Sequence, residues 1–196
     1  MSFKKEEIRL HTERLTLRPF RGDDLALIRR LYCDGQVLKY SPFDTLSSVQ
    51  AEAHLERIIR SWGQPPEYNY EMAVLLKGSE TRIGRAHIAV DRETDTGMIG
   101  CFLAPAHWGH GYGTEIACAL IDCCFDVLHL HRANALCHPE NLASRHMLEK
   151  CGMRLEAHFR KKCRYVKRGV TRWEDELQYA LLASERKTDA VNIHPG

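Results

Sequence analysis

The segment from Trp108 to Glu115 reads W-G-H-G-Y-G-T-E, and it comes directly before an apolar helical pattern. Its three alternating glycines lack a Cβ, so the backbone there can turn tightly and a ligand can approach it closely. The pattern from Ile116 to Leu128 predicts a helix, whose N-terminus favours anions through its free N–H groups and its dipole. The chain must therefore fold with this glycine loop at the start of a helix, and the loop predicts a binding site for a phosphate group.

The periodicity of apolar residues predicts strands with interspersed helices. Alternation predicts strands over residues 13–20, 68–76, 82–90, 96–103 and 132–137, and a final antiparallel pair over 154–165 and 173–182. Helical spacing and capping residues predict helices over residues 22–32, 47–62, 114–128 and 143–151. Because this order is not a regular alternation of strand and helix, it predicts an α+β fold with a mixed sheet rather than a doubly wound one.

Length and composition predict one ordinary globular domain. The chain has 196 residues, of which 44% are hydrophobic and 28% are charged, and this is enough for one well-buried core. We expect the domain to span residues 1–183, and we expect the polar residues 184–196 to form a disordered C-terminal tail.

Charge and targeting signals predict a cytoplasmic protein. The net charge of +2 is nearly balanced, so it favours neither nucleic-acid nor membrane binding. The N-terminus lacks the apolar core of a signal peptide, and no apolar run approaches the roughly 20 residues of a membrane span. The basic residues from Arg160 to Arg172 are either a solvated hairpin surface or a surface that attracts an acidic protein or RNA. No aromatic stacking pattern accompanies them, so we expect no specific nucleic-acid binding.

The eight cysteines support neither a disulfide framework nor a metal site. Six of them fall in apolar or helical segments, where a free cysteine behaves as a small hydrophobic residue. The spacing of zinc ligands is missing, since no C-x-x-C pair exists. The best remaining cluster combines His129, His131, Cys137 and His138, and we expect no metal there.

The glycine loop does not fit two familiar nucleotide motifs. A P-loop needs Lys followed by Ser or Thr after its last glycine, but Gly113 is followed by Thr114 and Glu115. A dinucleotide fingerprint needs G-x-G-x-x-G, and neither Gly109 nor Gly111 begins that spacing. A turn that only connects a strand to a helix remains the alternative to a phosphate site.

Two motifs in the right order resemble the GNAT superfamily of N-acetyltransferases. The pattern W-x-x-G-x-G from Trp108 to Gly113 is similar to its phosphate loop, and W-G-x-G-Y is common in its RimJ/RimL-like branch. About thirty residues on, the segment from Asn141 to Met153 resembles the N-x-x-S…E-K-x-G-F/M pattern of the same branch. Residues 12–18 resemble the first strand of that branch, and residues 173–179 resemble its last. The resemblance spans roughly residues 10 to 183.

The resemblance implies a GNAT-like fold that binds acetyl-CoA. The sheet would be mixed and mostly antiparallel, with a splayed central strand pair and helices on both faces. The pyrophosphate would lie on backbone N–H groups of the glycine loop, and the splayed strand would pair with the pantetheine arm. Asn141 would contact the cofactor or an ordered water, or else cap the following helix. The cofactor-binding residues carried over are Phe102, Leu103, Trp108, Gly109, His110, Gly111, Tyr112, Gly113, Thr114, Asn141 and Arg145.

Transfer of an acetyl group from a thioester to an amine needs a deprotonated amine, a stabilised oxyanion and a stabilised thiolate. No covalent enzyme intermediate is required, so no cysteine is expected to act as a nucleophile. Many relatives place an acidic Tyr where this chain has Leu148. Ser144 is the remaining hydroxyl in that segment, and we assign it the role beside the thiolate, with Asn141 as the second catalytic residue; Ser144 capping or facing the helix is the alternative.

The general base is not carried over from the family. Relatives often place a Glu where this chain has Met98. Because imidazole titrates near neutrality, the histidines at positions 87, 107, 138 and 158 are candidates. His138 lies next to Asn141 in the sequence and is our first choice. A water chain, or an amine that arrives neutral, would also suffice.

We therefore expect an N-acetyltransferase that uses acetyl-CoA and a primary amine, either a protein N-terminus or a small molecule, by direct transfer in a ternary complex. The alternative is a non-catalytic sensor or interaction protein that binds acetyl-CoA, since the family's Glu and Tyr are missing at Met98 and Leu148. Use of a longer acyl-CoA is a further alternative. Relatives often dimerise, so a homodimer is possible, and no membrane partner is expected.

Overall fold

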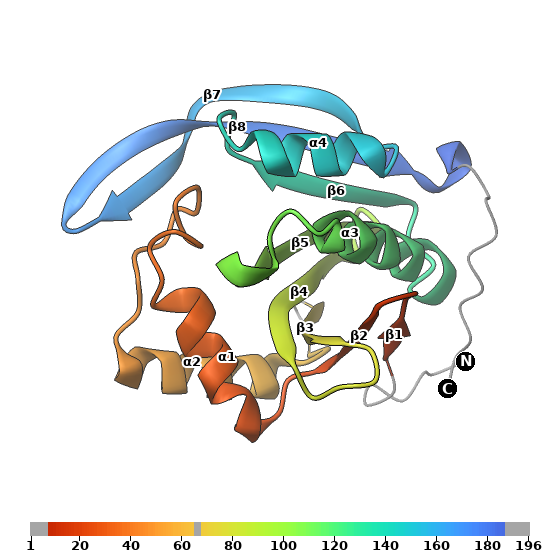
Figure 1. The fold of residues 1–196 in the computed structure, drawn as a ribbon. Helices are drawn as coiled ribbons and strands as arrows, with labels where there is room; N and C mark the ends of the chain where they lie inside the picture. Colours follow the sequence, from red (N-terminus) through yellow and green to blue (C-terminus); the bar gives the residue numbers. More distant parts are fainter. Residues whose placement is uncertain (1–7, 65–67, 187–196) are drawn as a thin grey trace.

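The computed structural model describes residues 8–64 and 68–186, which form an eight-stranded sheet between two layers of helices (Figure 1). The strand order is β1-β2-β3-β4-β5-β6-β8-β7. Neighbouring strands are antiparallel except β5 and β6, which are parallel. The strands are β1 (Leu10–His11), β2 (Leu15–Pro19), β3 (Tyr68–Leu76), β4 (Arg82–Asp91), β5 (Thr96–Leu103), β6 (Arg132–Cys137), β7 (Arg154–Lys167) and β8 (Val170–Leu182).

Helices cover both faces of the sheet, as the sequence predicts. The four α-helices of the described residues are α1 (Leu25–Tyr32), α2 (Ser48–Ser61), α3 (Tyr112–Asp122) and α4 (Leu142–Lys150). Helices α1 and α2 pack on one face around a core that includes Leu27, Leu31 and Ile58. Helices α3 and α4 contribute to the core of the other face, with Ile116 and Leu148 buried there. No helix in the described part is long and apolar enough to cross a membrane.

The central strands β5 and β6 part after three residue pairs. Thr96, Gly97 and Met98 pair with residues 132–134, and no pairing between the two strands follows. Strand β5 nevertheless continues to Leu103 and stays paired with β4 on its other edge. The sheet is therefore open between the second halves of β5 and β6. The mixed, mostly antiparallel sheet with a splayed central pair is confirmed.

The predicted helix over residues 114–128 is correct in place but not in form. The regular helix α3 ends at Asp122, and a π-helix follows from Cys123 to Val127. The Leu128 N–H donates to the Cys123 carbonyl 2.9 Å away, five residues earlier, and this hydrogen bond defines the wider turn. A period of 3.6 residues cannot reveal that change, because the apolar pattern continues through the widened turn.

The final hairpin is longer than predicted. Strand β7 runs to Lys167 and β8 starts at Val170, so only Arg168 and Gly169 form the turn. Both turn residues have positive φ, as a tight two-residue hairpin turn requires. Of the expected tail, Ser184 lies in a short 3-10 turn, and residues 187–196 lie outside the described part of the chain.

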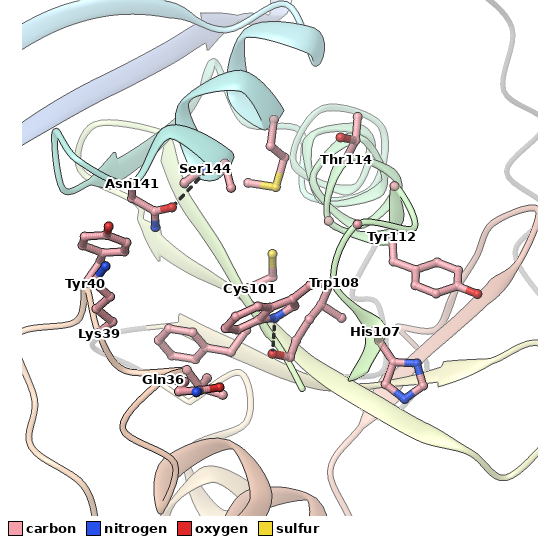
Figure 2. Close-up of a pocket in the computed structure, with 18 of the residues that line it drawn as sticks. Gln36, Lys39, Tyr40, Cys101, His107, Trp108, Tyr112, Thr114, Asn141 and Ser144 are labelled. Carbon is pink, nitrogen blue, oxygen red and sulfur yellow. Dashed lines mark hydrogen bonds between the residues drawn. The ribbon is translucent and has the colours of Figure 1, made fainter. Parts of the chain in front are cut away.

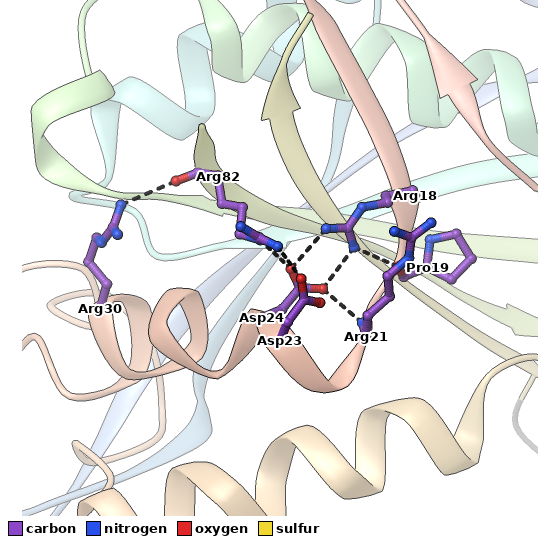
Figure 3. Close-up of polar contacts among 7 residues, drawn as sticks. All are labelled: Arg18, Pro19, Arg21, Asp23, Asp24, Arg30 and Arg82. Atoms are coloured by element: carbon purple, nitrogen blue, oxygen red, sulfur yellow. Dashed lines mark hydrogen bonds and ion pairs between the residues drawn. The ribbon is translucent and has the colours of Figure 1, made fainter. Parts of the chain in front are cut away.

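A buried ion-pair network ties the start of the α1 layer to the sheet (Figure 3). The Asp24 carboxylate is fully buried and accepts two hydrogen bonds from the Arg18 guanidinium, at 2.8 and 2.9 Å. It also accepts one from Arg82 Nε at 2.6 Å and one from the Arg21 N–H at 2.8 Å. Burial acts to raise the pKa of Asp24, but these hydrogen bonds outweigh it and the pKa is lowered. The network thus joins β2, β4 and the turn before α1.

We predict that Asp24→Asn lowers the free energy of unfolding by about 3 kcal/mol at pH 7, because it leaves the Arg18 charge buried without its counterion. Asp23→Asn is the matched control. The Asp23 side chain is 63% exposed and binds the same Arg82, so its loss should cost less than about 1 kcal/mol. Urea denaturation of the three proteins measures both values.

The effect of Asp24→Asn on the free energy of unfolding should also depend on pH. Because the folded-state pKa of Asp24 is lowered, its contribution is complete above the ordinary carboxyl pKa near 4 and is lost as the pH falls through the folded-state value. The stability difference between wild type and Asp24→Asn should therefore shrink in acid. A difference that stays constant from pH 7 to pH 3 would contradict this account.

Candidate active site

The glycine loop leads directly into helix α3. Gly109 and Gly111 have φ values of 76° and 79°, a left-handed conformation that side chains with a Cβ rarely adopt. Gly111 is the N-cap residue of α3, and Tyr112 begins the helix two residues before the predicted start. No side chain caps this helix, so its first N–H groups are available to a ligand. The glycine loop therefore lies at a helix N-terminus, as predicted, and the binding of an anion there remains a prediction.

Thr12 and Arg14, near the N-terminus, form a clamp on the loop through Glu115 and His110. Glu115, in the first turn of α3, accepts hydrogen bonds from the Thr12 hydroxyl at 2.5 Å and from Arg14 Nε at 2.8 Å. Arg14 Nη1 donates to the His110 carbonyl at 3.0 Å, within the loop itself. No local sequence pattern predicts this clamp, because its partners are about a hundred residues apart in the chain.

A cavity of about 830 Å³ lies beside the loop (Figure 2). The segment after α1, the second half of β5, the glycine loop and the start of α4 surround it. Trp108 Nε1 donates to the Leu103 carbonyl at 2.8 Å, which fixes the loop to the end of β5. The predicted site residues that line the cavity are Phe102, Leu103, Trp108, Gly109, Gly111, Tyr112, Gly113, Thr114, Asn141 and Ser144.

Two predicted cofactor contacts lie outside this lining. The His110 side chain bonds back to the Trp108 carbonyl through Nδ1 at 2.8 Å. The Arg145 guanidinium donates to the Tyr179 hydroxyl at 3.4 Å and to the Pro139 carbonyl at 3.3 Å. A contact of either residue with a cofactor remains a prediction.

Asn141 and Ser144 stand together at the start of α4. Asn141 is the N-cap residue, and its Oδ1 accepts a hydrogen bond from the Ser144 N–H at 3.2 Å. The capping role is therefore present, and the side chain also lines the cavity. Ser144 is partly buried and lines the cavity from the next turn. Figure 2 shows both side chains at the same end of the cavity.

A second cavity of about 370 Å³ adjoins the first, and residues of β5 and β6 beyond their paired part line it. Its walls come from the loop after Tyr40, from β4 and β5, from β6 and from the final hairpin. Glu176 on β8 is the one carboxylate among the described residues that line it, and Lys162 binds that carboxylate at 3.0 Å. Both cavities share the lining residues Tyr40, Cys101, Phe102, Asn141, Ser144 and Met147.

The candidate histidines are not equivalent in the structure. His138 lines the second cavity and stacks on Tyr40, with ring centroids 5.3 Å apart. His87 also lines the second cavity, and His107 lines the first. His158 lines neither and pairs with Asp175 on the outer hairpin at 2.7 Å. Chemistry near the junction of the two cavities is therefore open to His87 and His138.

The hairpin holds the loop that forms one wall of both cavities. The Tyr165 hydroxyl donates to the Tyr40 carbonyl at 2.8 Å, and Lys167 Nζ donates to the Leu38 carbonyl at 2.5 Å. Part of the basic run is neutralised as well, since Lys161 lies 3.7 Å from the Asp175 carboxylate. These residues therefore act in the structure of the site, a role that the charge pattern alone did not indicate.

The eight cysteines are free thiols, and Cys101 lines both cavities. Burial raises the pKa of the Cys101 thiol to about 11, which disfavours the thiolate that a nucleophile requires. No group of three or more His, Cys, Asp and Glu residues is placed to hold a metal ion in the described residues. The four-residue cluster around His129 and Cys137 is thus not assembled there.

The chain is similar to known acetyltransferases. The family model for the acetyltransferase (GNAT) domain matches residues 14–154. An uncharacterized N-acetyltransferase of Bacillus subtilis, YnaD, is 32% identical over 174 residues, which are 89% of this chain and 96% of YnaD.

Solved structures agree with the sequence comparisons. The structure of a GNAT-family acetyltransferase from Bacillus anthracis has a TM-score of 0.80 and 28% identity, over 91% of this chain and all of that one. Mycobacterium smegmatis RimJ, solved in complex with CoA-disulfide, has a TM-score of 0.74 and 23% identity, over 92% of this chain and 90% of that one.

Proposed function

This chain belongs to the GNAT acetyltransferase family and is an acyltransferase, and from that premise we propose that it moves an acetyl group from acetyl-CoA to a primary amine in a ternary complex. The observation that carries the proposal is the junction of the two cavities at the splay of β5 and β6. A donor in the first cavity and an acceptor in the second would meet there without a covalent enzyme intermediate.

The chemistry of the first cavity supports acetyl-CoA as its ligand. The uncapped start of α3 offers N–H groups to the pyrophosphate, and glycines at positions 109 and 111 let that group approach the backbone. The edge of β5 beyond Met98 has no partner strand, so its backbone groups can pair with the amides of the pantetheine arm. The structure of the RimJ relative with CoA-disulfide supports a CoA ligand for this fold.

The reaction follows from this arrangement. The amine nitrogen attacks the thioester carbonyl carbon, the new N–C bond forms, and the C–S bond breaks. The amine loses one proton, and the departing sulfur gains one. Ser144 borders both cavities, so its hydroxyl can donate a hydrogen bond to the departing thiolate. The Asn141 amide, at the same end of the cavity, can orient the thioester or an ordered water.

The acceptor is a small amine or the exposed N-terminus of a protein. A cavity of about 370 Å³ suits a small molecule or a terminal residue. The RimJ/RimL-like sequence motifs support a protein N-terminus, whereas the small volume of the cavity supports a small molecule. His138 lies on the wall of this cavity and remains our first choice as the general base. Free thiols at eight positions are consistent with a reducing cytoplasm.

The test is a thiol-release assay with acetyl-CoA and a panel of primary amines that includes polyamines, amino acids and N-terminal peptides. We expect CoA release with at least one amine and acetylation of that amine by mass spectrometry. Binding of acetyl-CoA by calorimetry without turnover on any amine would instead favour the alternative, a non-catalytic acetyl-CoA sensor. Faster release from longer acyl-CoAs would revise the donor and leave the acyltransferase assignment intact.

We predict that Gly111→Val weakens acetyl-CoA binding at least tenfold, because a Cβ at a φ of 79° strains the N-cap of α3 and blocks approach to its N–H groups. Gly169→Val is the matched control, since it introduces the same strain at a φ of 74° in the hairpin turn, and Gly169 lines neither cavity. Calorimetric titration of both variants with acetyl-CoA separates the loss of cofactor binding at the loop from a general effect of backbone strain. Equal affinities for the two variants would remove the loop from the cofactor site.

We also predict that Ser144→Ala lowers kcat about tenfold while the Kd for acetyl-CoA changes less than twofold. The substitution removes the hydroxyl but keeps the backbone N–H that donates to Asn141 Oδ1, so the N-cap hydrogen bond of α4 is retained. Ser61→Ala is the control, because it removes a hydroxyl on α2 that donates to the Ile58 carbonyl at 3.2 Å and lines neither cavity. Normal turnover in Ser144→Ala would leave this serine with a structural role.

A further inference from the structure

His87 lies in the middle of β4 and lines the second cavity. The residue is only partly buried, and the cavity is the open space that its ring borders. Its Nδ1 is buried and makes no hydrogen bond with any described residue. Buried polar atoms are nearly always paired, so an unpaired ring nitrogen beside a cavity calls for a specific explanation.

The His87 ring packs directly on the neighbouring strand β5. His87 stands opposite Gly100 in the register of β4 and β5. A Cβ on Gly100 would come within 2.4 Å of His87 Cε1 and 3.1 Å of its Nδ1, so the ring lies directly over this glycine. Gly100 belongs to the part of β5 that has left β6, and this brings the ring close to the junction of the cavities. The backbone has thus made room for the imidazole at that point.

The surroundings keep this imidazole neutral. Burial and the nearby Arg85 guanidinium together lower the pKa of His87 to about 3, against the opposing effects of Glu71 and of the Gly100 backbone. Arg85 and Glu71 form their own ion pair at 2.5 Å beside the ring. A neutral imidazole has one ring nitrogen that carries no proton and accepts hydrogen bonds.

We propose that His87 is the residue that receives the acceptor amine, accepting a hydrogen bond from an amine N–H so that the nitrogen lone pair points at the thioester carbon. This assignment rests on the proposed function. It gives His87 a role at the acceptor amine in a chain that has Met98 where relatives often have a Glu. The sequence alone favoured His138, because that residue lies next to Asn141. Correct orientation of a reacting group in this way is a major source of rate enhancement.

His54 supplies the matched control for this proposal. Its Nε2 is also buried without a hydrogen-bond partner in the described residues, and burial lowers its pKa to about 4. It packs against the Tyr32 ring at 4.3 Å, on the same face of the sheet as His87. His54 does not, however, line either of the two cavities. A histidine that is only structural should behave like His54.

The experiment compares His87→Ala, His87→Gln and His54→Ala with the best amine from the panel. His87→Ala should lower kcat/KM for the amine about 100-fold and leave the Kd for acetyl-CoA within twofold of wild type. Added imidazole should restore part of the activity of His87→Ala and none in His54→Ala. His87→Gln keeps a hydrogen-bond acceptor and should retain more activity than His87→Ala.

Gly100→Ala provides an independent arm that keeps the histidine itself. The new methyl group would displace the ring, so kcat/KM should fall about as far as in His87→Ala. In the double variant there is no ring to displace, so Gly100→Ala should cost nothing further. Full additivity of the two losses would overturn the proposal, as would activity within twofold of wild type in a folded His87→Ala. Absence of turnover with every amine in the wild type would instead overturn the proposed function on which this proposal rests.

Discussion

The parting of β5 and β6 is the constraint on which the rest of the structure depends. Two parallel strands that separate after three pairs leave one edge of each without backbone partners in the middle of the protein. Unpaired buried backbone groups are costly, so such an opening persists only where a ligand or water can satisfy them. Helix α3, with the glycine loop at its start, follows β5 directly and lines the cavity beside this opening. The proposed donor site is therefore a consequence of the topology.

Buried ion pairs fix the layer on the other side of the sheet. Asp24 joins β2 and β4 to the start of α1, and Glu71 with Arg85 joins β3 to β4 below the second cavity. Pairing offsets the cost of burying each charge, so these pairs favour the observed arrangement of their strands. Asp24 thereby holds the start of α1 against the sheet. The Arg85 charge also lowers the pKa of His87, which links this pair to the proposed acceptor site.

The sequence predicted the parts of the fold that depend on local patterns. The central strands and all four helices followed from periodicity and capping, and the glycine loop followed from the backbone freedom of Gly109 and Gly111. Contacts between distant segments were not predictable in this way. The clamp of Arg14 on Glu115 and the hydrogen bonds of the hairpin to the loop at Tyr40 join residues about 100 to 130 positions apart. The π-helix was missed because the apolar sequence pattern continues through the change of period.

This division between local and distant contacts explains why the donor can be assigned from sequence and the acceptor cannot. The proposed donor site uses backbone N–H groups and glycines within one short segment, so a single sequence motif is enough to predict its chemistry. The acceptor cavity is assembled from side chains of the loop at Tyr40, of β4, of β6 and of the hairpin. A substitution in any one of these segments can change the accepted amine without altering the glycine loop. His87 illustrates the point, since its significance depends on a glycine in the next strand that only the register of the sheet reveals.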